Sequence, residues 1–212
     1  MHPCPIPYLW YSKPIWQEGR ERDQPYVVER SMTGLDIFLI LVFVGVCVAA
    51  AVQGFIRQLM SLGVLFIVTA IVGSVYPYGA MALAAIQEEA PTLADGLAFL
   101  IMFLFFAIAM EALLRRGFPT TRLPKLKALD NILGLLVGVI NGLIIISLLL
   151  TLVGHTARRS WEEIAPRVRR ALIRAYRDAA LRPYLATFWE RYLTTHSIWF
   201  RRTPPLLAYL LQ

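Results

Sequence analysis

Four apolar stretches constrain this chain more than any other feature of its sequence. They cover residues 35–55, 59–75, 97–114 and 132–153. A bilayer core of about 30 Å is crossed by roughly 20 helical residues, at about 1.5 Å each. The chain is 58% hydrophobic and 17% charged, and its apolar residues are gathered in blocks rather than spread evenly. The sequence therefore predicts an all-α membrane protein with four transmembrane helices.

The positions of these stretches divide the chain into three parts. Residues 1–31 form an N-terminal extension rich in proline and aromatic residues. Residues 32–153 form a four-helix membrane domain, and 154–212 form an arginine-rich amphipathic tail. Met32 directly precedes the first apolar stretch, so we expect the chain from Met32 onward to insert and fold without the extension.

The two longer connections differ in charge, which bears on topology. Residues 76–96 are acidic and are expected to hold a short helix around 80–89, whereas residues 115–128 form a basic loop. Short basic loops remain in the cytoplasm, which places both tails outside the cytoplasm. The arginines of the tail argue for the opposite orientation. We follow the loops and expect a multi-pass membrane protein with extracytoplasmic tails.

The tail has the pattern of one amphipathic helix broken near Pro183, or of two helices. Ser160 followed by Glu163 has the spacing of a capping box, which satisfies N–H groups at a helix start. Apolar residues such as Val168 recur at helical spacing, opposite a charged face. Anionic lipid head groups are the expected partner of that face, a protein is the alternative, and nucleic acid is not expected. Its arginines are Arg167, Arg170, Arg174 and Arg177.

The fourth apolar stretch combines small and polar residues on one side. Gly134, Gly138 and Gly142 are spaced by four, and Asp130 and Asn141 fall along the same side of a helix. Glycines allow close approach of a neighbouring backbone, and an amide can hydrogen-bond across such a seam. We interpret this side as a helix-packing surface. The alternative is that it lines a conduction or binding path.

Three acidic residues lie in or near the apolar stretches. Asp36 and Asp130 begin the first and fourth stretches, where a carboxylate can cap its own helix. Glu111 precedes Arg115 by four residues, the favourable order for a helical ion pair. We therefore interpret Glu111 as a paired charge near the membrane boundary, with a proton relay as the alternative.

Short motifs in this order resemble the colicin V production protein (CvpA) family. A Leu-Asp pair opens the first stretch, a Gly-Phe pair and an arginine close it, and a second Leu-Asp pair precedes the spaced glycines. The residues are Leu35, Asp36, Gly54, Phe55, Arg57, Leu129 and Asp130, followed by Gly134, Gly138 and Gly142. The resemblance covers about residues 33–153. Two positions depart from the family pattern, because Gln53 and Asn131 stand where basic residues are common.

The resemblance implies a bacterial inner-membrane protein linked to colicin V production, toxin export and envelope stress tolerance. It implies no molecular activity. His2, His155 and His196 lie far apart in the sequence, and no nucleophile, phosphate or dinucleotide motif is present. We therefore predict no enzyme, no metal and no cofactor.

Three functions remain open at this point. The first is an oligomeric membrane scaffold or assembly factor in toxin export and envelope maintenance. The second is a small transporter or channel built by oligomerisation. The third is a membrane anchor that binds a membrane or envelope protein through its C-terminal segment.

Overall fold

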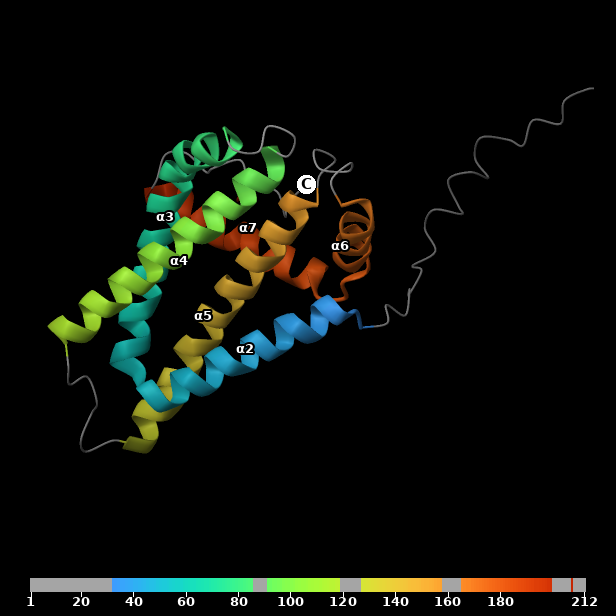
Figure 1. The fold of residues 1–212 in the computed structure, drawn as a ribbon. Helices are drawn as coiled ribbons and strands as arrows, with labels where there is room; N and C mark the ends of the chain where they lie inside the picture. Colours follow the sequence, from blue (N-terminus) through green and yellow to red (C-terminus); the bar gives the residue numbers. More distant parts are fainter. Residues whose placement is uncertain (1–31, 86–90, 119–126, 158–164, 200–206, 208–212) are drawn as a thin grey trace, which may run out of the picture. The chain divides into compact units, whose positions relative to one another are not determined.

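The described part of the chain contains helices and no strands. The structure is a computed structural model that describes residues 32–85, 91–118, 127–157, 165–199 and 207. These residues belong to one unit, and the predicted N-terminal extension lies outside them. The helices, shown in Figure 1, are α2 (Gly34–Gln53), α3 (Phe55–Ala84), α4 (Pro91–Gly117), α5 (Lys127–Thr156), α6 (Pro166–Asp178) and α7 (Arg182–Trp199).

The first four helices, α2 to α5, each contain a segment long and apolar enough to cross a membrane. This confirms the predicted all-α fold with four transmembrane helices. Helix α3 pairs with α4, α2 pairs with α5, and a further α3–α5 contact joins the two pairs. Helix α5 contacts each of the other described helices. The four spanning helices therefore form one bundle around α5.

Helix α3 is longer than the sequence pattern indicated. It continues through Tyr76 and Pro77 to Ala84, so the expected link with a separate helix around 80–89 is wrong up to that point. Tyr76 is buried against Phe99 of α4, with ring centroids 5.8 Å apart. This packing stabilises a helix that the Tyr-Pro-Tyr-Gly sequence alone argued against. Residues 86–90 lie outside the described chain.

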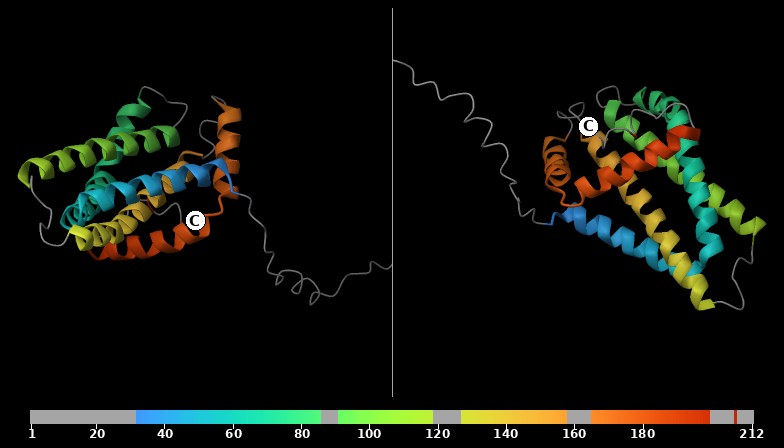
Figure 2. Two further views of the ribbon diagram at one scale, coloured as in Figure 1. Left: turned by 90° about the horizontal axis from the view of Figure 1, so that it is seen from below. Right: turned by 180° about the vertical axis from the view of Figure 1, so that it is seen from behind.

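Helices α6 and α7 complete the unit. Helix α7 lies on the face of the α2–α5 pair opposite α4 (Figure 2). Its buried face carries Leu185, Trp189, Leu193 and His196, and Trp189 Nε1 donates to the carbonyl oxygen of Leu207 at 2.7 Å. Burial raises the pKa of Tyr192, on the same helix, to about 12. The tail is therefore packed onto the bundle.

Helix α6 differs from its predicted form in two respects. It begins at Pro166, and the capping box expected at Ser160 and Glu163 lies outside the described residues. Val168 was expected on the buried face but is 60% exposed, whereas Arg169 and Tyr176 are buried. The guanidinium of Arg182 stacks 4.6 Å from the centre of the Tyr176 ring. Which side of α6 is buried therefore depends on its contacts with α2, α5 and the start of α7, and not on side-chain polarity alone.

Candidate functional site: a helix seam and a polar groove

The turn between α2 and α3 is closed by a carboxylate from α5. Gly54 has φ 89° and ψ 167°, a conformation that is essentially restricted to glycine. Phe55 N donates to Asp130 Oδ1 at 2.9 Å, and a Cβ on Gly54 would overlap the Asp130 carboxylate. We expected Asp130 to cap its own helix. It caps α3 instead, because the turn brings the first N–H of α3 to α5.

Asp36 makes a second junction of this kind. Its carboxylate accepts hydrogen bonds from the backbone N–H and the hydroxyl of Thr33, both at 2.9 Å, which caps α2. It also accepts from the backbone N–H groups of Ala180 and Leu181, both at 3.1 Å. These two residues immediately precede α7. A fully buried carboxylate therefore ties the start of α2 to the start of α7.

The three spaced glycines of α5 face α2. A Cβ on Gly134 would lie 2.9 Å from the carbonyl carbon of Gly54, and one on Gly142 would lie 2.7 Å from Cδ2 of Phe43. A Cβ on Gly138 would overlap the side chain of Ala50, which is fully buried. We call this contact between α2 and α5 the glycine seam. A Cβ would meet backbone atoms at Gly134, the Ala50 side chain at Gly138 and the Phe43 ring at Gly142, so each position has room only for glycine unless its neighbour shifts.

Asn141 meets a different helix from the glycines beside it. Its Nδ2 donates to the backbone oxygen and to Oε1 of Gln58 in α3, at 3.2 and 2.9 Å. Gln58 Nε2 in turn donates to Gln53 Oε1 at 3.2 Å. We expected the glycines and the Asn141 amide to contact the same neighbouring helix, and this expectation is wrong. Helix α5 lies against both α2 and α3, so neighbouring positions on it reach different helices.

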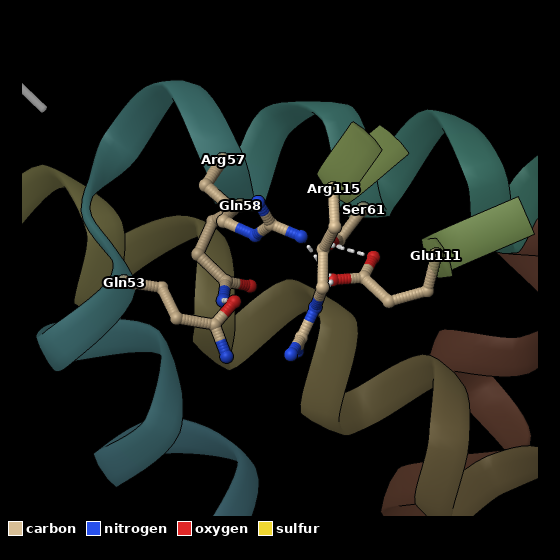
Figure 3. A network of polar contacts seen from close by, with 6 residues as sticks. All are labelled: Gln53, Arg57, Gln58, Ser61, Glu111 and Arg115. Carbon is tan, nitrogen blue, oxygen red and sulfur yellow. Dashed lines mark hydrogen bonds and ion pairs between the residues drawn. The ribbon is translucent and has the colours of Figure 1, made fainter. Parts of the chain in front are cut away.

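A charged cluster joins α3 to α4. Figure 3 shows it beside the amides of Gln53 and Gln58. The predicted ion pair between Glu111 and Arg115 is present at 3.4 Å, but Arg57 lies closer to Glu111, at 2.5 Å. Ser61 Oγ donates to the other carboxylate oxygen of Glu111 at 3.3 Å. The arginine of the resemblance motif is therefore an interhelical ion-pair partner.

This cluster borders a cavity of about 570 Å³ that is open to one side. We call it the polar groove. It lies between α2 and α4, over α3 and α5, and its polar lining comes from Gln53, Gln58, Ser61, Glu111, Arg115 and Asn141. The remaining lining is apolar and comes from Val46, Ala49, Val64, Leu65, Ala107, Ile108, Ala112 and Ile145.

The arginines predicted to contact lipid lie on the exposed side of α6. They are Arg167, Arg170, Arg174 and Arg177. Within the described residues, no group of three or more histidine, cysteine or acidic side chains is arranged to hold a metal ion. His155 Nε2 lies 3.6 Å from Asp95 Oδ2, between α5 and α4.

Several residues of both regions were missed at the level of sequence. Ala50 lies four residues before the motif residue Gly54 and faces the glycines, so a small-residue pattern did exist at the end of α2. Gln58 is an amide near the start of a spanning helix, and such a polar side chain could have suggested a partner on another helix. The structure shows that it is buried. Ser61 gave no signal that distinguishes it from other small polar residues.

Comparison with known proteins assigns the family. A family model described as Colicin V production protein matches residues 35–188. The match runs beyond residue 153 and therefore includes α6 and the first part of α7. No curated protein and no solved structure matches the chain significantly. With most of its length matched, and with four helices of membrane-spanning length, the chain belongs to the colicin V production protein family.

Proposed function

We propose that this protein is a non-enzymatic scaffold in the bacterial inner membrane, acting in colicin V production or export and in envelope maintenance. The observation that supports this role is the use of its buried polar groups. Asp36, Asp130 and Asn141 each hydrogen-bond to a segment of the chain outside their own helix. Such groups fix the positions of helices, because leaving them unpaired in an apolar environment costs several kcal/mol.

A fixed bundle is what an assembly factor needs, since it presents constant surfaces to its partners. We propose that the working form is a homo-oligomer and that a further membrane or envelope protein binds to it. The exposed arginines of α6 fit a contact with anionic head groups, worth about 1 kcal/mol per arginine near a charged surface. This contact would hold the tail against the membrane.

The proposed orientation places the basic loop in the cytoplasm and both tails outside. A single cysteine can test it in a chain whose Cys4 and Cys47 have been replaced by serine. A cysteine at Thr120 should react with an impermeant reagent only after permeabilisation, whereas one at Ser160 should react in intact spheroplasts. The reverse pattern would show that the arginines of the tail set the orientation.

The scaffold role can be tested in a strain that makes colicin V and lacks its own family member. Expression of this chain should restore secreted colicin V activity, and an Asp130→Ala variant of equal abundance should restore less. Purified protein in liposomes should not increase the passage of ions or small solutes. Normal secretion in cells without any family member would contradict the proposal.

The second candidate is a small oligomeric transporter or channel. One observation favours it, namely the polar side chains that line the groove at Gln53, Gln58 and Glu111. A transport role predicts solute flux in liposomes that Asn141→Leu abolishes without loss of stability. Flux that survives this substitution, or no flux at all, would count against a path through the groove.

A further inference from the structure

We propose that the polar groove is a binding site for one anionic phospholipid, with the head group at the charged cluster and an acyl chain along the apolar wall. The proposal goes beyond the scaffold role and does not depend on it. It concerns a site separate from the arginines of α6, because no residue of α6 lines this cavity.

The first argument is charge. Glu111 is already paired with Arg57 at 2.5 Å, so Arg115 leaves the cluster with a net charge of +1. The Arg115 side chain is 65% exposed and borders the cavity. A guanidinium binds a phosphate through paired N–H donors, as it binds a carboxylate. The mouth of the groove is therefore complementary to a phosphodiester head group.

The second argument is the order of polar and apolar residues along the helices. The end of the bundle that contains Gly54 also contains the last turns of α4 and the first turns of α5. From this end inward, polar lining gives way to apolar lining on each of the four helices that line the groove, with Ala112 on α4 as the exception. The pairs are Gln53 and Val46 on α2, Ser61 and Leu65 on α3, Glu111 and Ala107 on α4, and Asn141 and Ile145 on α5. A phospholipid in the adjacent leaflet has the same order.

The third argument is size. A spanning helix about 30 Å long and about 10 Å across occupies roughly 2,400 Å³, so it cannot enter a cavity of about 570 Å³. Pockets of about 300–1,000 Å³ are the size that holds small molecules and cofactors. The basic sequence between α4 and α5, which includes Arg122 and Lys125, also attracts anionic lipid to this end of the bundle.

Native mass spectrometry of the full chain, with phosphatidylglycerol and phosphatidylcholine as probes, tests the head-group site. We expect one retained phosphatidylglycerol per chain and weaker retention of phosphatidylcholine. Arg115→Gln should lower phosphatidylglycerol retention about tenfold, because it removes a charge-assisted contact. Arg116→Gln is the matched control, since Arg116 is exposed on the same helix turn but does not line the cavity. It should retain the lipid normally.

A second pair of variants tests the acyl-chain site. Ala49→Phe fills the groove, whereas Val48→Phe changes an exposed neighbour on α2 that lies outside it. Only the first should reduce lipid retention. If Ala49→Phe does not fold, Ala107→Phe with Leu104→Phe as its exposed control tests the same wall from α4. All these variants keep the α6 arginines, so lipid held there does not change between them.

Three results would overturn the proposal. Equal retention of both lipids by all variants would show that the groove has no head-group preference. Displacement of the bound lipid by inorganic phosphate, with no effect of Ala49→Phe, would identify a site for a small anion. A dimer in place of a lipid complex, lost in Ala49→Phe but kept in Val48→Phe, would show that a second copy of the chain covers the groove.

Discussion

Helix α2 presents two adjacent faces that behave in opposite ways. One face, which includes Phe43 and Ala50, packs directly against the glycines of α5 and forms the glycine seam. The other, which includes Val46, Ala49 and Gln53, borders the open polar groove. Both faces belong to one helix that is only 20 residues long, from Gly34 to Gln53.

The difference shows what closes a helix contact in a membrane. Lipid tails are as apolar as leucine, so hydrophobic burial does not draw spanning helices together. The seam closes because glycine removes the side chain that would hold two backbones apart, which increases dispersion contacts and permits the Asp130 junction. Beside the groove, Glu111 pairs with Arg57 of α3 and with Arg115 of its own helix, so the charged cluster joins α4 to α3 rather than to α2.

The largest expected effect comes from filling the seam. Gly138→Leu places a side chain where a Cβ alone would overlap Ala50, so we expect a loss of about 3 kcal/mol in unfolding free energy, at the upper end of overpacking costs. Unfolding in detergent measures this change. The matched control is Gly45→Leu on α2, where nothing lies within 4 Å of a Cβ. An equal loss in both variants would mean that the seam is no tighter than the lipid-facing surface.

The next effect concerns the turn at the end of the seam. Gly54→Ala should destabilise by about 2 kcal/mol, because alanine tolerates its φ of 89° poorly and the new Cβ would displace the Asp130 carboxylate. Gly63→Ala, within α3 and open around the Cβ, should be neutral or slightly stabilising. The thermal midpoints of the two variants separate these effects. Similar midpoints would contradict a special role for the turn.

The amide contact should matter less than the seam. Asn141→Leu removes hydrogen bonds to Gln58 and makes the span more apolar, so we expect normal insertion and a loss of about 1 kcal/mol. A double-mutant cycle with Gln58→Leu measures the coupling between the two residues directly. A loss larger than that of Gly138→Leu would reverse the ranking of seam and groove.

The smallest effect tests a region outside both faces of α2. Burial lowers the pKa of His196, whose ring lies 4.9 Å from that of Phe66. The unfolded chain therefore takes up a proton more readily than the folded chain, and stability should fall as the pH drops below about 6.5. The thermal midpoint should be slightly lower at about pH 5.5 than at about pH 7.5. His196→Phe should reduce this difference, and an unchanged difference would assign it to other groups.

Much of the fold could be predicted because it depends on local patterns. Length and apolarity of the four stretches are sufficient to identify spanning helices, and the motif order is sufficient to suggest the family. The end of α3 could not be predicted, because Tyr-Pro-Tyr-Gly is a turn signal unless Tyr76 packs against α4. The buried side of α6 was also misjudged, since Arg169 is buried there and Val168 is not.

The candidate site was predictable in its residue types but not in its pairings. Asp36 and Asp130 have the position of helix caps, and each does accept backbone N–H groups. The sequence contains no information about which distant N–H groups these are. Glu111 is a similar case. Helical spacing predicts its ion pair with Arg115, but nothing in the sequence predicts its closer partner, Arg57.

The sequence by itself determined that the chain forms four apolar helices and that the glycines and the amide of α5 fall on adjacent positions. These properties depend on helix geometry, which repeats every 3.6 residues whatever surrounds it. Only the tertiary structure decided that the glycines contact α2, that Asn141 contacts α3, and that the polar groove remains between α2 and α4. Helical periodicity orients a side chain about its own axis, whereas the neighbour it meets depends on how all the helices pack together.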